Sequence, residues 1–254
     1  MTESTPILEA RNLGKSFESS NTLLPAVSDI SFSVFHGEFL CIVGPSGCGK
    51  TTILQMLAGL QSRTRGEIYL KGKVLHNPDR DISVVFQKPN LMPWRTVLQN
   101  TLLPLQIDGV QKKEAEERAL GYLEKVGLSD FADAYPKELS GGMEQRVAVA
   151  RALVQNPGIL LLDEPFGALD SFTREQLNLE LLSLWRDQSI TAIMVTHNIR
   201  EAVLLADRVL VLTPRPATVF KEFTINLPRP RTEEIEYTPD FVNLTYEIRK
   251  SIKA

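Results

Sequence analysis

One glycine-rich stretch decides the fold, and it is Gly44-Pro45-Ser46-Gly47-Cys48-Gly49-Lys50-Thr51. It follows the pattern GxxxxGK[ST], in which glycines let backbone N–H groups curl around phosphate oxygens. The stretch comes directly after the apolar run 39–43 and directly before a helical pattern over 51–60. That helix would present its positive N-terminus to the same anion. The sequence therefore predicts a strand, a phosphate-binding loop and a helix in succession.

This arrangement is typical of proteins that bind a nucleoside triphosphate with Mg²⁺. Lys50 is expected to reach the β- and γ-phosphates, and the Thr51 hydroxyl is expected to bind the metal ion. A dinucleotide site is disfavoured because no third glycine follows at the required spacing. The remaining alternative is an ordinary glycine-rich turn with a surface lysine. The candidate nucleotide-binding residues of this segment are Gly44, Pro45, Ser46, Gly47, Cys48, Gly49, Lys50, Thr51 and Thr52.

The composition describes a globular chain of 254 residues with 43% hydrophobic residues. Its 28 Lys and Arg against 31 Asp and Glu give 28 − 31 = −3, so we expect no nucleic-acid partner. No apolar run exceeds five residues, whereas a membrane-spanning helix needs about 20. Residues 1–6 contain no basic segment followed by an apolar one, so the cytoplasm is expected. Cys41 and Cys48 match no zinc or disulfide spacing and are expected to be small buried or loop residues.

Short β-rich runs recur along the chain and predict strands buried on both faces. Helical patterns at 51–60 and 199–206 lie among them. Alternation of this kind favours an α/β fold with a largely parallel sheet. The runs are 39–43, 67–70, 82–86, 159–162, 191–195 and 209–212.

Residues 88–156 differ from the rest because they carry helical periodicity and no convincing buried strand. Ala115, Ala119, Leu123 and Val126 repeat at spacings of four, four and three, as on one helix face. We expect a helical lobe inserted into the α/β core. After residue 212, four prolines predict an irregular appendage that ends in a helix around 241–252.

Two acids follow the apolar run 159–162, at the strand end where open α/β sheets bind ligands. Asp163 is placed to hold magnesium, and Glu164 is placed to polarise an attacking water. The alternative is that both acids cap a helix.

A second glycine-rich helix start comprises Ser140, Gly141 and Gly142, followed by Met143 and a helix-prone segment. Alone it is a serine-glycine helix start. Together with the P-loop and the paired acids it resembles the signature motif of ATP-binding cassette (ABC) ATPases. The family most often carries glutamine where this chain has Met143, and because Ser140, Gly141 and Gly142 are intact we expect the signature contact to be altered but not lost.

Further elements resemble this family in order along the chain. Phe17 resembles the aromatic residue that stacks on adenine, and Gln87 resembles the glutamine that contacts Mg²⁺ and water. Residues 168–170, which end in Asp170, resemble the D-loop, and His197 resembles the switch histidine that contacts the γ-phosphate. Each of these residues also has an ordinary alternative. Phe17 could be a half-buried aromatic residue and Gln87 a solvated loop residue. Asp170 could be a helix cap and His197 a surface histidine. The resemblance implies catalytic roles for Glu164, His197, Gln87 and Lys50, metal binding by Thr51, Gln87 and Asp163, and nucleotide contacts by Phe17, Ser140, Gly141 and Gly142.

The resemblance implies a single ABC ATPase domain over 1–254. Its P-loop NTPase core has a mainly parallel sheet and is expected at about 1–87 and 157–212, with an antiparallel β subdomain. The helical subdomain is expected at about 88–156 and the appendage at about 213–254. The chain has one P-loop and one signature, so a second ABC ATPase subunit, identical or paralogous, would complete two ATP sites.

The stretch at 88–100 lies where family members receive a coupling helix from a membrane subunit. Its apolar part, Leu91 to Trp94, is expected either to meet such a partner or to be buried against the helical lobe. The amino-acid sequences of this stretch and of 227–231 resemble those of importer ATPases of the nitrate, sulfonate, taurine and bicarbonate class. The alternative for 227–231 is a basic linker stiffened by proline.

The importer resemblance implies two transmembrane permease subunits and a periplasmic or lipid-anchored solute-binding protein as partners. It places the chain at the cytoplasmic face of the inner membrane. The alternative is a soluble ABC ATPase of iron–sulfur assembly, repair or translation. A P-loop small-molecule kinase would leave the signature and His197 unexplained.

Overall fold

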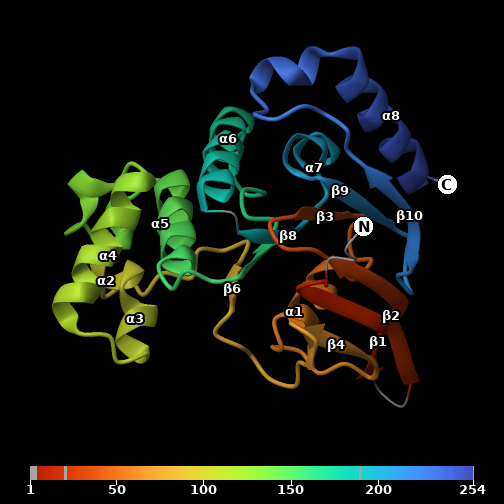
Figure 1. Ribbon diagram of the computed structural model, residues 1–254, viewed down its shortest axis with the longest axis horizontal. Coiled ribbons are helices and arrows are strands. Elements are labelled where there is room, and N and C mark those ends of the chain that lie inside the picture. Colours follow the sequence, from red (N-terminus) through yellow and green to blue (C-terminus); the bar gives the residue numbers. More distant parts are fainter. Residues whose placement is uncertain (1–4, 20–21, 189, 254) are drawn as a thin grey trace. The chain divides into compact units, whose positions relative to one another are not determined.

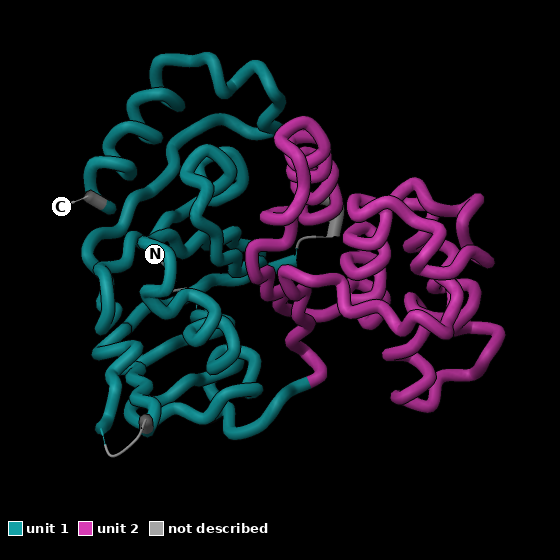
Figure 2. Tube along the Cα trace, turned by 180° about the vertical axis from the view of Figure 1, so that it is seen from behind, with its two compact units in different colours: residues 1–79, 189–254 teal, residues 80–188 magenta. Residues whose placement is uncertain are grey.

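The chain divides into two units in the computed structural model, which describes residues 5–19, 22–188 and 190–253. Figure 1 shows the elements, and Figure 2 colours the units separately. Unit 1 comprises residues 1–79 and 189–254, and unit 2 comprises residues 80–188. Residues 1–4, on which the expectation of no secretory signal partly rests, lie outside the described residues.

Unit 1 contains an antiparallel sheet with strand order β2-β1-β4-β5. The strands are β1 (Leu8–Ser19), β2 (Thr22–Val34), β4 (Arg65–Leu70) and β5 (Lys73–Val74). The expectation that 67–70 is buried on both faces is wrong, because burial alternates along β4 and Glu67 is exposed. This antiparallel sheet has one exposed face, and its strands therefore alternate.

Unit 1 also contains four strands in the order β10-β9-β3-β8. They are β10 (Val219–Thr224), β9 (Arg208–Leu212), β3 (Phe39–Val43) and β8 (Thr191–Thr196). β3 runs parallel to both β8 and β9, and every residue of β3 and β8 is buried. Full burial of a Val, Leu, Ile, Phe or Met side chain, as found in both strands, contributes about 1.5–3 kcal/mol. These strands form the core that positions the phosphate-binding loop.

The helices of unit 1 are α1 (Lys50–Leu57), α7 (Ile199–Leu205) and α8 (Pro239–Lys253), with a short 3₁₀ turn η3 (Glu233–Tyr237). α1 packs against β8, and α7 packs against β3 and β8. Figure 1 shows α7 and α8 on one side of these strands and α1 on the other. The appendage is more regular than expected, because β10 pairs antiparallel with β9 before α8 begins.

Unit 2 contains β6 (Ile82–Val85), parallel to β7 (Ile159–Asp163), together with the helical region. The predicted helical face is confirmed, because Ala115, Ala119, Leu123 and Val126 are all buried. The helices are α2 (Val97–Thr101), α3 (Leu103–Ile107), α4 (Lys112–Lys125), α5 (Gly141–Leu153) and α6 (Ser171–Gln188), with 3₁₀ turns η1 (Ser129–Phe131) and η2 (Pro136–Glu138).

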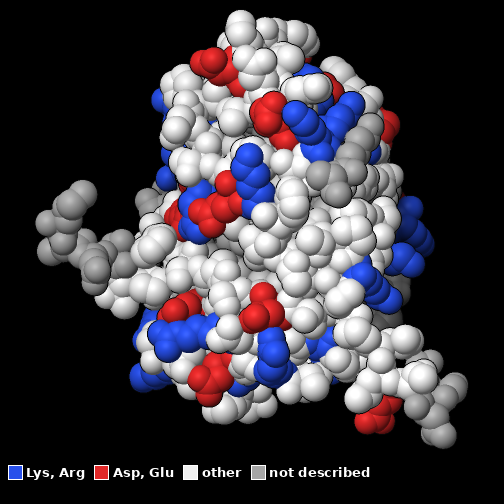
Figure 3. Space-filling model, turned by 90° about the vertical axis from the view of Figure 1, so that its right-hand side faces the viewer, with Lys and Arg blue, Asp and Glu red and all other residues white. Residues whose placement is uncertain are grey.

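Opposite charges are interspersed on one face of the protein. On the face in Figure 3, Lys and Arg side chains lie among Asp and Glu side chains. Ion pairs among the described residues include those of Arg208 with Glu38 at 2.5 Å and with Glu222 at 2.6 Å. None of the helices in the described parts of the chain is long and apolar enough to span a membrane.

Candidate active site

The phosphate-binding loop connects the buried strand β3 to the start of α1. Gly47 and Gly49 have φ values of +74° and +119°, a left-handed region that L side chains rarely adopt. A Cβ on Gly49 would also lie 3.2 Å from the carbonyl oxygen of Ala26, whereas one on Gly47 would meet no atom within 4 Å. The loop therefore needs glycine for its conformation and leaves open space at Gly47. Its backbone N–H groups and the start of α1 form a cradle for an anion.

Lys50 is held inside this loop. Its side chain is buried, and its Nζ donates to the carbonyl oxygens of Gly44 at 3.0 Å and Pro45 at 3.1 Å. The loop thus fixes an ammonium group at its centre. Burial raises the pKa of the neighbouring Cys48 thiol, although Lys50 lowers it in part. Both Cys41 and Cys48 are buried and not in a disulfide, as predicted.

His197 emerges at the same edge of unit 1 as the phosphate-binding loop. In the parallel pairing of β3 with β8, Val43 lies opposite Thr196. The residues that follow, Gly44 and His197, therefore start from neighbouring strand ends, and His197 is exposed. Parallel pairing thus places His197 and the start of the phosphate-binding loop after neighbouring strand ends.

Phe17 lies on β1, where it pairs with Leu24 of β2. Its side chain is 39% exposed, so the ring is not part of the core. The Nζ of Lys15 lies 5.1 Å from the ring centroid. An exposed aromatic face in unit 1 suits stacking on a planar base.

In unit 2, Gln87 and the two acids also lie at one sheet edge. β6 and β7 are parallel, and Val85 lies opposite Leu162. Gln87 follows two residues after Val85 and is exposed, while Asp163 is buried at the end of β7. Glu164 has a φ of +42°, which is uncommon for a residue other than glycine. Such backbone strain is typical of functional sites, and it begins a turn closed by the Gly167 N–H donating to the Glu164 carbonyl.

The signature-like motif forms the N-terminus of α5. Ser140 is the N-cap, and its Oγ accepts from the Met143 N–H at 3.4 Å. A Cβ on Gly142 would lie 3.0 Å from the Cγ2 of Thr173 in α6. The missing side chain therefore allows the first turns of α5 and α6 to approach closely. The helix-start interpretation is correct locally, and the exposed Ser140 and Gly141 remain accessible to a ligand.

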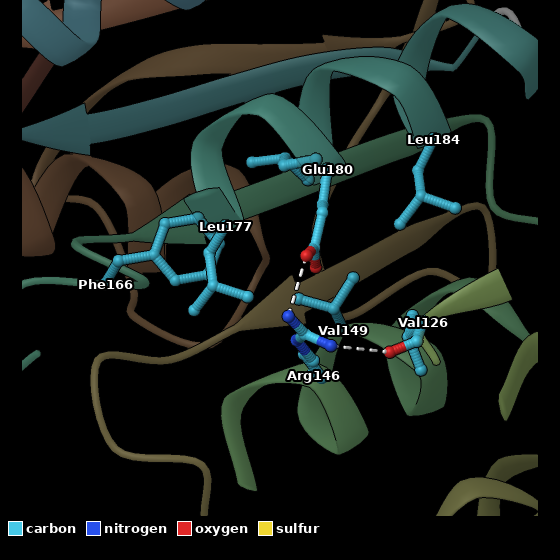
Figure 4. A pocket seen from close by; sticks show the side chains of 8 residues that line it. Val126, Arg146, Val149, Phe166, Leu177, Glu180 and Leu184 are labelled. Carbon is cyan, nitrogen blue, oxygen red and sulfur yellow. Dashed lines mark hydrogen bonds and ion pairs between the residues drawn. The ribbon is translucent and has the colours of Figure 1, made fainter. Parts of the chain in front are cut away.

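An ion pair joins α5 to α6 further along. Figure 4 shows Arg146 and Glu180 pointing toward each other within a pocket lined by apolar side chains such as Leu177 and Leu184. Their nitrogen and oxygen atoms are 2.7 Å apart. Burial raises the pKa of Glu180, and Arg146 acts in the opposite direction. The charge pair thus holds the signature helix against α6.

Asp170, in the D-loop-like stretch, caps α6. Its Oδ1 accepts from the Thr173 N–H at 3.0 Å, and this hydrogen bond lowers the pKa of the carboxyl group. The capping interpretation is therefore correct for Asp170.

Three side chains outside the predicted site hold the backbone around and after Gln87. Gln145 of α5 donates to the Phe86 carbonyl at 3.2 Å, and Arg151 donates to the carbonyls of Pro89 and Asn90 at 2.5 and 3.0 Å. The signature helix therefore fixes the backbone on both sides of Gln87. Sequence spacing indicated the helix but carried no signal for these long-range partners.

Asn100 is the third of these side chains and is fully buried in α2. Its amide accepts from the Met92 N–H and donates to the carbonyls of Met92, Arg95 and Thr96. This network presents Trp94, whose side chain is 70% exposed. Burial against the helical lobe is therefore wrong for Trp94, and its exposed ring is available to a partner.

Among the described residues, no cluster of three His, Cys, Asp or Glu side chains forms a metal site. A hydroxyl, an amide and one carboxylate suit Mg²⁺ only if phosphate oxygens and water complete the shell. Residues of these three types are present, Thr51 in unit 1 and Gln87 and Asp163 in unit 2. The residues present are therefore compatible with magnesium that arrives with a nucleotide.

The sequence profile of the family described as "ABC transporter" matches residues 27–167. The chain belongs to the ABC transporter family. The cassette is 42% identical to a nitrate import ATP-binding protein of Synechocystis, over 97% of this chain and 95% of the relative. It is 45% identical to a taurine import ATP-binding protein of Rhizobium johnstonii, over 88% and 87% of the two chains.

A solved structure supports the same assignment of the cassette. This structure is a dimeric ATP-binding cassette in a post-hydrolysis state bound to ADP and Pi. It superimposes with a TM-score of 0.78 at 34% identity, covering 87% of this chain and all of the other. The predicted ABC ATPase fold is confirmed, and the cassette is an ATP-binding protein.

Proposed function

We propose that this chain is the ATP-hydrolysing subunit of an ABC importer for a small anion or related solute of the nitrate, sulfonate, taurine and bicarbonate type. The observation that carries ATP binding is the buried Lys50 ammonium held within a glycine loop at the start of α1. The nitrate and taurine import relatives favour transport over a soluble role in repair, translation or iron–sulfur assembly.

The P-loop, residues 44–52, binds the phosphates of ATP through its backbone N–H groups and Lys50. Phe17 stacks on the adenine. Thr51, Gln87 and Asp163 hold Mg²⁺, which supplies charge neutralisation on the phosphate oxygens. These residues are divided between the two units, so the assignment rests on motif order along the chain together with the local geometry within each unit.

Hydrolysis requires a water molecule to be oriented and a developing negative charge to be stabilised. Glu164 orients and polarises the water, and Gln87 assists it. His197 donates a hydrogen bond to the γ-phosphate. The strained backbone of Glu164 and the register of His197 beside the P-loop strand support these roles.

A second cassette completes each ATP site. Ser140, Gly141 and Gly142 at the start of α5 contact the ATP held by the P-loop of the partner copy, because a helix N-terminus binds anions. ATP that bridges two copies stabilises the closed dimer, and its hydrolysis removes the bridge. The dimeric cassette that superimposes on this chain supports such pairing.

The closing and opening of the cassette dimer drives a pair of transmembrane permease subunits, which it contacts at the cytoplasmic face of the inner membrane. A periplasmic or lipid-anchored solute-binding protein delivers the solute to them. The exposed Trp94 and its neighbours Leu91 and Met92, pinned by Asn100, form the contact with the permease.

The test is ATP-dependent dimerisation. Glu164→Gln keeps the size of the side chain but removes the base, so this variant should bind Mg-ATP and accumulate a dimer in size-exclusion chromatography. Lys50→Ala should lose nucleotide affinity and remain monomeric. A Glu164→Gln protein that stays monomeric at saturating Mg-ATP would contradict the paired site. Unchanged ATP affinity in Lys50→Ala would contradict the P-loop assignment.

A further inference from the structure

The turn that carries His197 is fixed by its neighbours on both sides. The Thr196 hydroxyl donates to the Glu201 carboxylate at 2.5 Å and accepts from the Asn198 N–H at 3.0 Å. The Asn198 side chain caps α7 by accepting from the N–H groups of Arg200 and Glu201. The backbone at His197 is therefore tied to the first turn of α7, and displacement of α7 displaces His197.

The carboxyl-terminal segment holds α7 at its first turn. Both Nε and Nη2 of Arg200 donate to the same carboxylate oxygen of Glu236, at 2.9 and 2.5 Å. The Glu236 side chain is only 12% exposed. The Arg200 guanidinium also lies 5.3 Å from the ring centroid of Phe241, which is fully buried at the start of α8.

The same segment holds α7 at its last turn. The buried Arg231 donates to the carbonyls of Val203, Leu204 and Ala206. Arg229 donates to the Leu205 carbonyl and to Asp207. Figure 1 shows the chain between β10 and α8 passing across α7. Residues 229–241 therefore form a brace, the α7 brace, with contacts at both helix ends.

The charge at position 200 indicates why this brace has an acidic partner. The N-terminus of a helix carries a partial positive charge, so an arginine in the first turn is unfavourable there. The Glu236 carboxylate offsets this charge and fixes the direction of the guanidinium. The contact therefore adds to the acidic Glu201 of the same turn in offsetting the charge of Arg200.

We propose that Glu236 is a positioning residue for ATP hydrolysis, because through Arg200 it sets the first turn of α7 and hence the place of His197. This proposal rests on the proposed function, since it requires His197 to contact the γ-phosphate. It gives the appendage a role in the catalytic cycle that is separate from nucleotide binding.

The test substitution is Glu236→Gln, which keeps the shape and removes the charge. Its matched control is Glu222→Gln, because Glu222 pairs with Arg208 between β9 and β10 and takes no part in the hydrogen bonds described above for α7. The Glu236→Gln protein should bind ATP as the wild type does, keep its KM, and lose about three- to tenfold in kcat. The control should keep its kcat within about twofold. A kcat loss that is equal in both variants would overturn the proposal.

A second readout follows His197 without activity. The chain has three histidines, so the ring signals of His36 and His76 are internal references in an NMR spectrum. Glu236→Gln should move the His197 ring signals and leave those of His36 and His76 in place, and Glu222→Gln should leave the His197 signals in place. Unmoved His197 signals in Glu236→Gln would overturn the proposal. If Glu236→Gln does not fold, Arg200→Lys is the second variant, because it keeps the charge but loses the two-donor contact. This variant should give the same His197 shift and kcat loss, and wild-type values in it would overturn the proposal.

His197→Ala distinguishes a failure of the proposed role of His197 from a failure of the positioning role of Glu236. If His197→Ala hydrolyses ATP like the wild type, the proposed role of His197 fails, and the positioning role fails with it. If His197→Ala lowers kcat and Glu236→Gln does not, only the positioning role fails. In the His197→Ala background, Glu236→Gln should cause no further loss, and a further loss of the same size would show that Glu236 acts elsewhere.

Discussion

Arg231 ties the carboxyl-terminal segment to the end of α7, and replacing it with methionine removes these contacts together with two longer ones to the Ile225 and Leu227 carbonyls. Its side chain is only 4% exposed. Its Nη1 donates to the carbonyls of Val203, Leu204 and Ala206 at 3.1, 2.9 and 2.7 Å. Burial, with a smaller effect of Arg229, lowers its pKa to about 10, so the guanidinium stays charged at neutral pH.

The magnitude follows from these carbonyls. Those of Val203 and Leu204 belong to the last turn of α7 and that of Ala206 to its C-cap, where helix carbonyl groups have no partner within the helix. Methionine has a similar volume but donates no hydrogen bond, so three buried acceptors lose their donor. Each charge-assisted bond is worth about 1.5–3 kcal/mol, and removal of a buried charge returns part of that sum. We expect the free energy of unfolding to fall by about 2–4 kcal/mol.

The matched control is Arg229→Met. Arg229 is more exposed and contacts Asp207 and the Leu205 carbonyl, so its loss should cost about 1 kcal/mol. Urea unfolding followed by circular dichroism measures both variants, and hydrogen exchange locates the effect. Exchange should accelerate in α7 and α8 of Arg231→Met. A loss below about 0.5 kcal/mol, or one equal to that of the control, would refute the reasoning.

Further predictions concern positions where the structure shows one dominant cause. Replacing Asn100 with leucine removes the hydrogen-bond partner of the Met92 and Arg95 carbonyls. The free energy of unfolding, measured in urea, should fall by about 2–4 kcal/mol. An unchanged urea midpoint would contradict the network. Gly121→Ala, in α4 with nothing within 4 Å of the new Cβ, should stabilise the protein by about 0.5–1 kcal/mol. Gly59→Ala should destabilise the protein, because the φ of Gly59 is +70° and the new Cβ would lie 2.6 Å from the backbone of Asn77. Thermal melts that rank the two variants in the reverse order would refute this local geometry. The Thr173 N–H lowers the pKa of Asp170, so the stabilisation is present above the unfolded pKa of about 4 and is lost as the pH falls through the folded pKa. The stability of the wild type relative to Asp170→Asn should therefore decrease between about pH 6 and pH 3, and an increase would contradict the assigned cap.

The P-loop was predictable because glycine spacing encodes its backbone. Gly47 and Gly49 have the left-handed conformations that the motif requires. The strand runs around it were predictable because parallel strands are buried on both faces, as β3 is. The registers that bring Gln87 to Asp163 and His197 to the P-loop strand follow from parallel pairing, but the pairing itself needed the structure.

The residues that were missed act through tertiary contacts that no local pattern encodes. Gln145, Asn100 and Arg231 each bond backbone groups distant in the sequence, so their partners depend on the packing of whole elements. The basic-linker interpretation of 227–231 is wrong for Arg231, because this cation is buried against helix carbonyls. β1 was not predicted as a strand because bulges between Ala10 and Ser16 interrupt its alternation.

The most direct test of the central claim is co-purification from native membranes. The chain carries an affinity tag, the membranes of its host are solubilised in mild detergent, and the bound proteins are identified. The account predicts an integral membrane protein at a one-to-one ratio with this chain, together with ATP hydrolysis that a solute-binding protein stimulates. Recovery only from the soluble fraction, bound to other soluble proteins, would contradict the importer function.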